Sequence, residues 1–319
     1  MRSKWPTTNP VNEFELIHQY LKQPEPPHSE VRVGHGDDCA VFSVRPTHEL
    51  CVSVDATLEG RHVPMGTSGD LFAQRAFRRA LSDLAACGAT PKYLLSSLSS
   101  VDFAPDWIRA FGETLHALCR QWGMTVLGGD LSKGPTAAHL TVFGEVPVGQ
   151  AMTRRGAQAG DAIVYFGRDC GGARAYLEVL SGRAAVPVWQ TRYWFPEPQC
   201  ALGEQLRGHA TACLDVSDGL LQDLMHVLNA ASSPLCAELR SDAVPMCAGM
   251  VEAFGATEAL RMALTGGDEY ALIATLPQAD PLVAGGHVLG TLSTSQVPCL
   301  SLDGHRISVA EWAGWDHSR

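Results

Sequence analysis

The chain has little positive charge and no long apolar run. Its 24 lysine and arginine residues stand against 34 aspartate and glutamate residues, which gives a formal net charge of −10. Proteins that bind nucleic acids or anionic membrane surfaces usually carry a basic patch, so both classes are disfavoured. No apolar run approaches the roughly 20 residues of a membrane-spanning helix, and we expect no secretion signal in the first residues.

Paired cysteine motifs are also missing, although the chain contains 10 cysteines. None lie two or three residues apart, and the closest pair is Cys236 and Cys247. This spacing excludes CxxC zinc sites and CxxC redox motifs. Scattered single thiols suit a reducing compartment, so we expect a cytoplasmic protein.

Several familiar catalytic motifs do not occur. The chain has no GxxxxGK[ST] loop, no HRD or DFG segment of a protein kinase and no GxSxG elbow. The segment GHGDDC at residues 34–39 does not match the dinucleotide-binding pattern GxGxxG. A P-loop NTPase, a protein kinase and an α/β-hydrolase are therefore excluded.

Hydrophobic periodicity predicts alternating strands and helices. Two of the helices have an apolar stripe, one at Ala73, Ala76, Phe77, Ala80, Leu81 and Leu84 and the other at Leu220, Leu221, Leu224, Val227 and Leu228. We expect helices near residues 13–21, 71–87, 106–122 and 171–180, and strands near 49–60, 93–100, 125–130, 139–147 and 161–167. Residues 210–232 are typical of a strand, an acidic turn and a helix, whereas the Pro-rich and aromatic stretch 186–200 predicts an irregular loop. The pattern restarts near residue 150, which predicts two domains, 1–150 and 151–319, in an α/β or α+β fold.

Acidic residues gather in six short segments that we predict to be glycine-flanked turns. These are residues 34–38, 53–55, 81–83, 128–130, 214–219 and 266–269. A single aspartate beside a glycine is usually only a turn or a helix cap. Six such segments, each beside a strand or helix end, instead favour one shared site.

Two of these segments suggest a bound cation. Strand alternation puts Ser53 and Asp55 on one face, opposite the apolar residues that we expect to face the core. Asp83 lies in the last turn of its predicted helix, where the helix dipole disfavours a carboxylate by up to ~1 kcal/mol. Oxygen ligands without paired histidines or thiolates indicate Mg²⁺ or Ca²⁺, and Mg²⁺ commonly shares its coordination with phosphate oxygens.

The order of these segments resembles that of the thiamine-monophosphate kinase family, over about residues 12–317. The matching pieces are GHGDDCAVF, SVDATLEGRHV, ALSDLAACGATP, VLGGDLSKGP, MTRRGAQAGD, LDVSDGLLQDL, LTGGDEYALIAT and WAGWDH. The family belongs to the superfamily of aminoimidazole ribonucleotide synthetase and selenophosphate synthetase. The resemblance implies an N-terminal ATP- and Mg-binding domain whose sheet forms a barrel across a homodimer, and a C-terminal α/β domain that completes the active-site cleft.

The implied reaction is ATP-dependent phosphorylation of thiamine monophosphate to thiamine diphosphate, the last step of thiamine diphosphate biosynthesis. By resemblance, several Mg²⁺ ions would be bound by Asp38, Ser53, Val54 (through its carbonyl), Asp55, Asp83, Asp130, Asp215 and Asp218. Asp83, Asp130 and Asp218 would be the catalytic carboxylates. ATP would contact Gly129, Asp130, Arg154 and Ser217, and thiamine monophosphate would contact His62, Asp268 and Trp315.

The chain departs from the family pattern at a few positions. The usual Gly-Gly-Glu-Asp is Gly-Gly-Asp-Glu here, which leaves open whether Asp268 or Glu269 meets the substrate. Trp312 competes with Trp315 as the residue that stacks on the cationic thiazolium ring. Gln199 stands where the family has arginine, and Lys133 is an additional candidate for steering phosphate.

Two other functions remain open at this stage. One is another enzyme of the superfamily, such as an ATP-dependent ligase or a selenophosphate synthetase. A selenophosphate synthetase uses a reactive cysteine or selenocysteine near its N-terminus, but no cysteine precedes Cys39 in this chain. The other is a non-enzymatic Ca²⁺-binding or assembly module of two α/β domains, which has no need of His62, Arg154 or the aromatic segment EWAGWDH at residues 311–317.

Overall fold

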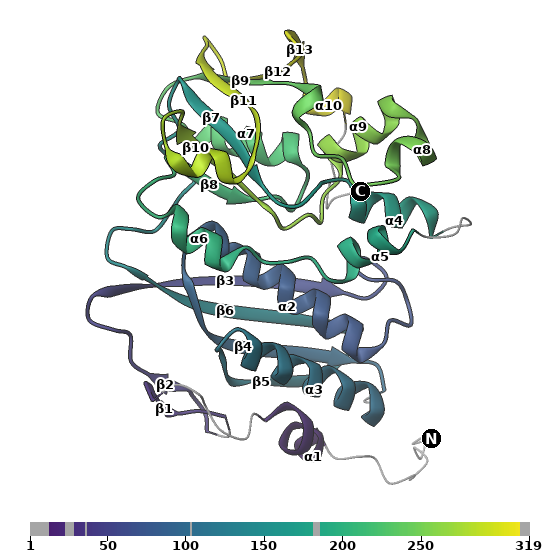
Figure 1. The fold of residues 1–319 in the computed structure, drawn as a ribbon. Coiled ribbons are helices and arrows are strands. Elements are labelled where there is room, and N and C mark those ends of the chain that lie inside the picture. Colours follow the sequence, from purple (N-terminus) through teal and green to yellow (C-terminus); the bar gives the residue numbers. More distant parts are fainter. Residues whose placement is uncertain (1–12, 23–28, 36, 103, 181–185, 313–319) are drawn as a thin grey trace, which may run out of the picture. The chain divides into compact units, whose positions relative to one another are not determined.

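The computed structural model describes residues 13–22, 29–35, 37–102, 104–180 and 186–312 (Figure 1). The chain separates into two compact units. The N-terminal unit comprises Met1–Val44, Val54–Phe77 and Lys92–Val142, and the C-terminal unit comprises Arg45–Ser53, Arg78–Pro91 and Phe143–Arg319. The predicted domain boundary near residue 150 stays a prediction.

The first half of the chain builds a four-stranded sheet with the strand order β3-β6-β4-β5. Strands β4 and β5 are parallel neighbours, and β3 and β5 are the edges. The elements in chain order are α1 (Glu13–Leu16), η1 (Ile17–Leu21), β1 (Val31–Val33), β2 (Val41–Phe42), β3 (His48–Leu58), α2 (Gly69–Ala86), β4 (Thr90–Ser100), α3 (Pro105–Gln121), β5 (Thr125–Lys133) and β6 (Ala137–Pro147).

The second half builds a seven-stranded sheet with the order β13-β12-β9-β11-β7-β10-β8. Strands β12 and β9 are parallel, and the other neighbours are antiparallel. The elements are β7 (Asp161–Phe166), α4 (Gly172–Val179), α5 (Pro187–Trp194), α6 (Cys200–Leu206), β8 (Ala212–Asp215), α7 (Leu220–Ala230), β9 (Leu235–Leu239), η2 (Ser241–Ala243), α8 (Met250–Phe254), α9 (Ala256–Thr265), β10 (Leu272–Pro277), η3 (Pro281–Gly285), β11 (His287–Thr294), β12 (Cys299–Leu302), β13 (His305–Ile307) and α10 (Val309–Trp312).

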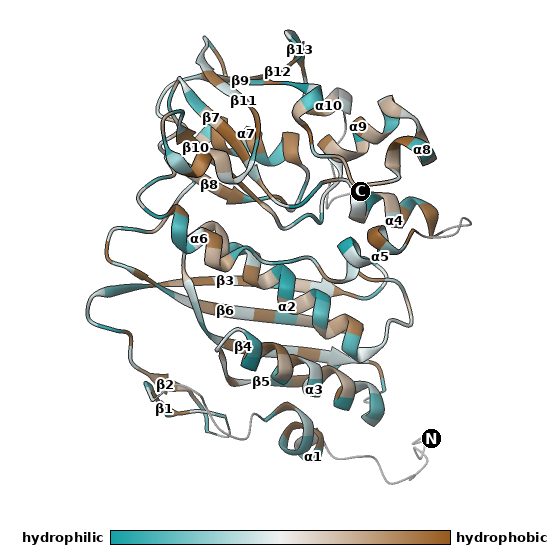
Figure 2. Cartoon of the chain, in the orientation of Figure 1, coloured by the Kyte–Doolittle hydropathy of each residue, from teal (hydrophilic) through white to brown (hydrophobic). Residues whose placement is uncertain are grey.

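The predicted apolar faces of two helices are confirmed. In α2, the stripe that begins at Ala73 and ends at Leu84 is at most 2% exposed. In α7, Leu220, Leu224 and Leu228 belong to the core cluster that packs under the seven-stranded sheet. Figure 2 shows the strands β7 and β8 of this sheet largely in the brown of hydrophobic residues. Within the described part of the chain, no helix has both the length and the apolarity that a membrane span requires.

The predicted irregular loop at residues 186–200 is wrong over its first half, where helix α5 forms. Pro187 occupies the first turn of this helix, a position where its missing N–H costs nothing. Trp189, Tyr193 and Trp194 are at most 6% exposed. Their shared burial on one side of the helix stabilises it despite the flanking prolines.

Three of the six acidic segments lie inside regular elements and not in turns. For two of them this agrees with the predicted strand over 49–60 and the predicted helix over 71–87, whereas the glycine turn expected at residues 128–130 is wrong. Residues 53–55 belong to β3, residues 81–83 to α2 and residues 128–130 to β5. In β5, a Cβ atom on Gly129 would lie 2.0 Å from the carbonyl oxygen of Ser96 on β4. The glycine therefore serves a close approach of two strands rather than a change of chain direction.

Strand β3 differs from the prediction in what covers its apolar face. We expected Leu50, Val52 and Val54 to face the core, but they are 38%, 54% and 63% exposed. Leu58 on the same strand is 39% exposed. Alternation shows which residues share a face, but it does not reveal whether that face is covered within one chain.

Candidate functional site

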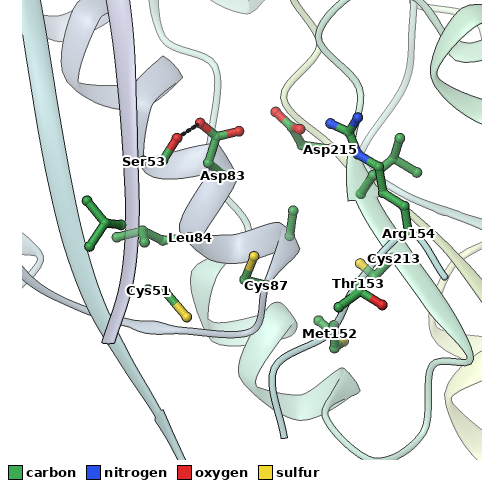
Figure 3. A pocket seen from close by; sticks show the side chains of 13 residues that line it. Cys51, Ser53, Asp83, Leu84, Cys87, Met152, Thr153, Arg154, Cys213 and Asp215 are labelled. Atoms are coloured by element: carbon green, nitrogen blue, oxygen red, sulfur yellow. Dashed lines mark hydrogen bonds between the residues drawn. The ribbon is translucent and has the colours of Figure 1, made fainter. Parts of the chain in front are cut away.

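A cavity of about 210 Å³ in the C-terminal unit brings together four of the predicted site residues (Figure 3). Ser53 comes from β3, Asp83 from the last turn of α2, Arg154 from the segment after β6 and Asp215 from the end of β8. The Ser53 hydroxyl donates a hydrogen bond of 2.5 Å to Asp83. Residues that are far apart in the sequence thus present oxygen ligands and one guanidinium to the same space.

The electrostatics of this cavity favour binding of a cation. Asp215 is 5% exposed. Its burial raises its pKa to about 7, and the negative charge of Asp83 acts in the same direction. Arg154 opposes this rise, and Figure 3 shows its guanidinium turned toward the Asp215 carboxylate. The cavity therefore contains a carboxylate whose ionised form needs more positive charge than the protein supplies.

Backbone hydrogen bonds fix the segment that carries Arg154. The N–H of Cys213 on β8 donates to the Thr153 carbonyl at 2.9 Å. The Thr153 hydroxyl accepts from the N–H of Arg155 at 3.2 Å. Gly156 has a φ of +105°, and a Cβ atom there would lie 2.4 Å from the Thr211 carbonyl oxygen. Arg154 therefore projects from a turn that is tied to the edge strand of the sheet.

The loop between β8 and α7 carries Ser217 and Asp218, and a buried carboxylate holds it. Oδ2 of Asp223 accepts hydrogen bonds from the N–H groups of Ser217, Asp218 and Gly219 at 3.0, 3.0 and 3.1 Å. Asp223 is 2% exposed. The sequence analysis missed this residue, although an acid in the first turn of a predicted helix was an available signal.

The loop between α9 and β10 places Asp268 beside Ser217. The N–H of Asp268 donates to the Ser217 carbonyl at 2.9 Å. Tyr270 donates its hydroxyl hydrogen to the Asp268 carboxylate at 2.8 Å and accepts from Nε of Arg79 at 2.6 Å. The sequence analysis missed Arg79 and Tyr270, because a contact across 191 residues leaves no local pattern.

Glu269 is oriented differently from its neighbour Asp268. Its carboxylate accepts a 2.7 Å hydrogen bond from the N–H of Gly171, directly before helix α4. Withdrawal from water raises the Glu269 pKa to about 8, and the charges of Asp169 and Asp268 contribute to this rise. Its Gly171 hydrogen bond gives Glu269 a structural role.

In the N-terminal unit, Gly129 and Asp130 lie on edge strand β5. They line a narrow cavity together with His35 and Ser96. The Ser132 hydroxyl donates to the Asp130 carboxylate at 2.6 Å. Asp130 and Ser132 are exposed and share one face of the strand, two residues apart.

The other predicted residues of this unit lie on β3 and on the loops next to it. Asp55 is half-buried on β3, Val54 beside it is exposed, and Asp38 is exposed in the segment before β2. His62 follows β3, and its Nδ1 accepts a 3.0 Å hydrogen bond from the N–H of Leu58. With Nδ1 as the acceptor, a neutral His62 ring carries its hydrogen on Nε2.

Of the remaining candidate residues, the structure describes Trp312, Gln199 and Lys133 but not Trp315. Trp315 lies outside the described residues, whereas the side chain of Trp312 packs against the core of the seven-stranded sheet. Gln199 precedes helix α6 and donates to the Glu197 carbonyl at 2.9 Å. Lys133 is exposed at the end of β5.

Among the described residues, one group of three side chains has potential metal-ligand atoms close to one another. Asp218, Asp223 and His226 offer ligand atoms within 4.8 Å of one another. Because Oδ2 of Asp223 already accepts three backbone N–H groups, this group does not by itself indicate a cation.

Comparisons with known proteins give one family model and several curated relatives. Residues 36–146 match the family model of the AIR synthase related protein, N-terminal domain. The chain is 33% identical to the thiamine-monophosphate kinase of Escherichia coli (strain K12), over 96% of this chain and 98% of that protein.

Solved structures of thiamine-monophosphate kinases have the same fold as this chain. The chain superposes on the thiamine-monophosphate kinase of Stenotrophomonas maltophilia K279a with a TM-score of 0.80 and 31% identity, over 88% of this chain and 93% of that one. A structure of AaThiL complexed with AMPPCP and TMP matches with a TM-score of 0.75 and 23% identity, over 83% of this chain and 87% of that one. At that identity, the second match supports the fold alone.

Proposed function

The chain belongs to the thiamine-monophosphate kinase family, and we propose that it transfers the γ-phosphoryl group of ATP to thiamine monophosphate. The observation that carries this proposal is the cavity where Ser53, Asp83, Arg154 and Asp215 meet. An arginine, the buried carboxylate of Asp215 and the half-buried one of Asp83 around one space suit phosphoryl transfer, which depends on positioning and charge neutralisation.

The donor set fits magnesium. Ser53, Asp83 and Asp215 supply only oxygen ligands to the cavity, and its buried carboxylate lacks full compensation of charge. We propose that the ions are bound by the eight positions Asp38, Ser53, Val54, Asp55, Asp83, Asp130, Asp215 and Asp218. When bound, Mg²⁺ neutralises the phosphate oxygens of ATP and makes an acidic site compatible with a polyanion.

Nucleotide binding is proposed for Gly129, Asp130, Arg154 and Ser217. The absence of a side chain on Gly129 allows the close pairing of β5 with Ser96. Arg154 supplies a guanidinium that can form two parallel hydrogen bonds with a phosphate. The turn at Thr153 holds it at the cavity without a glycine-rich phosphate loop.

Thiamine monophosphate is proposed to contact His62, Asp268 and Trp315. Asp268, rather than Glu269, is our choice of acid, because Glu269 is committed to the N–H of Gly171. The Tyr270 hydroxyl orients the Asp268 carboxylate. His62 can donate its Nε2 hydrogen to the substrate phosphate, and Trp315 would stack on the cationic thiazolium ring.

The proposed chemical step is direct in-line transfer without a phosphoenzyme. A phosphate oxygen of thiamine monophosphate attacks the γ-phosphorus, and the bond from that phosphorus to the bridging oxygen of ADP breaks. The attacking phosphate is largely ionised at neutral pH, so no strong general base is required. Asp83, Asp130 and Asp218 act as the catalytic carboxylates by holding charge in place around the reacting groups.

We further propose a homodimer in which the four-stranded sheet continues into a partner's sheet as a barrel. Strand β3 is an edge of the sheet, and its face with Leu50, Val52, Val54 and Leu58 is exposed. Contiguous apolar surface on an edge strand is a liability in a monomer and is commonly covered by association. The proposal also keeps the two predicted domains, residues 1–150 and 151–319.

An acceptor screen tests the function. ADP release is measured with ATP, Mg²⁺ and, in parallel, thiamine, thiamine monophosphate or a substrate of the aminoimidazole ribonucleotide synthetase reaction. We expect turnover with thiamine monophosphate and formation of thiamine diphosphate in equal amount to ADP. ADP release with another acceptor, and none with thiamine monophosphate, would contradict the proposal.

A further inference from the structure

The β8–α7 loop has the form of an anion-binding site that the protein fills with its own side chain. The N–H groups of Ser217, Asp218 and Gly219 converge on Oδ2 of Asp223. They directly precede helix α7, so the positive end of the helix dipole adds to their attraction for negative charge. Successive N–H groups before a helix are the arrangement that binds phosphate in P-loop proteins.

A second set of contacts holds the same loop from its carbonyl side. The Ser217 carbonyl accepts from the N–H of Asp268 at 2.9 Å, and the Val216 carbonyl accepts from the N–H of Tyr270 at 2.8 Å. A Cβ atom on Gly267 would lie 2.3 Å from the Ser217 carbonyl oxygen, so this approach requires a glycine. The loop backbone is therefore engaged on both sides.

We propose that Asp223 is a positioning residue that occupies the backbone anion site of residues 217–219. As a result, the loop meets the nucleotide through the side chains of Ser217 and Asp218 and not through its N–H groups. This inference rests on the proposed function and deepens it. The geometry contrasts with a P-loop, where the equivalent N–H groups bind the phosphates directly.

The charge of Asp223 explains why an internal ligand suits this protein. Three converging N–H groups without a carboxylate would attract a phosphate of ATP or of the second substrate to the wrong place. A buried carboxylate that cannot leave excludes such binding and keeps the loop in one conformation. Asp223 contacts neither substrate in this proposal and acts only through the loop.

Asp223→Ala tests the inference, with Asp161→Ala as the matched control. Asp161 is another buried aspartate, 5% exposed, which accepts the N–H of Gln158 at 2.9 Å and the Thr211 hydroxyl at 2.6 Å. It lies outside the loop. The measurements are amide hydrogen exchange of residues 216–219, and kcat and KM for both substrates.

We expect exchange of the loop amides in Asp223→Ala to rise at least about tenfold, while β8 and α7 keep their protection. We expect kcat to fall at least about 30-fold further than in Asp161→Ala, with a smaller change in the KM for thiamine monophosphate. Formate, a carboxylate that fits the emptied space, should restore part of kcat in Asp223→Ala and none in the control. If Asp223→Ala does not fold, Asp223→Asn replaces it, without the formate arm.

Unchanged loop exchange in the variant, or a kcat within about threefold of that of Asp161→Ala, would overturn the positioning role. The exchange measurement does not depend on the identity of the phosphate acceptor. A wild-type protein that is inactive on thiamine monophosphate therefore contradicts the proposed function, while the exchange of the loop amides still decides the role of Asp223.

Discussion

The two units hold their acidic residues in different ways. In the N-terminal unit, Asp55 and Asp130 extend from strands, and a single hydroxyl, that of Ser132, contacts the Asp130 carboxylate. In the C-terminal unit, Ser217, Asp218 and Asp268 lie on loops whose backbones are tied by several hydrogen bonds. A strand fixes its side chains through the ladder of the sheet, whereas a loop needs dedicated partners to reach the same precision.

This difference has a consequence for mutations. On strand β5, the Asp130 side chain is exposed, so its replacement should lower activity with little loss of stability. On the loops, buried groups such as Asp223, Tyr270 and Arg79 support the site, so activity and stability should change together. The following predictions use this contrast.

The largest effect is expected for Asp83→Asn, which removes a negative charge and almost no volume. We expect kcat to fall by about 1,000-fold, because charge neutralisation around the transferred group is lost. The melting temperature should change little, because the Ser53 hydroxyl can still donate to the amide oxygen. Asp242→Asn, at an exposed position, is the control. A wild-type kcat with normal Mg²⁺ dependence in Asp83→Asn would contradict the proposed catalytic role of Asp83.

Asp268→Asn should raise the KM for thiamine monophosphate by about 30-fold, because a charged hydrogen-bond partner of the substrate is lost. Glu269→Gln should raise it much less, since the Gln oxygen can still accept from Gly171. Steady-state kinetics of both variants on one batch of substrate make the comparison. The reverse order would mean that Glu269 has taken the substrate role.

Trp315→Ala should raise the KM for thiamine monophosphate about tenfold, which corresponds to the ~1–2 kcal/mol of a cation–π contact. The KM for ATP should change little, and Trp315→Phe should recover part of the loss. Trp312→Ala is the contrasting variant: it should lower the melting temperature, because Trp312 packs on the core. An equal loss for both substrates in Trp315→Ala, or a KM effect found only in Trp312→Ala, would refute stacking by Trp315.

The last prediction concerns the pH dependence of stability. The Glu269 pKa is raised from 4.5 to about 8 in the folded protein, so the folded state retains a proton that the unfolded state releases. This contribution to stability is complete below pH 4.5 and is lost as the pH rises toward 8. Glu269→Gln should therefore flatten the decline by up to about 1.4 kcal/mol per pH unit. Urea unfolding at pH 5.5, 6.5 and 7.5 measures it, and parallel curves for the two proteins would contradict it.

The sequence predicted the helices and their buried faces better than it predicted what covers each strand. The stripe from Ala73 to Leu84 identified helix α2 and its buried face, because helix periodicity records burial along one element. The same reasoning found strand β3 but not the exposure of Val52 and Val54. What covers a face depends on parts of the assembly that one strand's pattern does not encode.

The candidate site shows the same limit. The order of the motifs predicted that Asp83, Arg154 and Asp215 share one site, and these residues do line one cavity. It gave no sign of the bond between Glu269 and Gly171, which spans 98 residues. The residues proposed to contact a substrate lie in sequence motifs that can be recognised. Their hydrogen-bond partners come from distant segments, and only the tertiary structure reveals them.

Helix α2 contributes Arg79 and Asp83, four residues apart and therefore on one face of the helix. Asp83 reaches the cavity proposed for the nucleotide phosphates, and Arg79 holds Asp268 through the Tyr270 hydroxyl. One rigid rod thus connects the groups proposed for the two substrates. Any effect of one bound substrate on the position of this helix would therefore change the affinity for the other substrate, and thermodynamic linkage makes that effect equal in both directions.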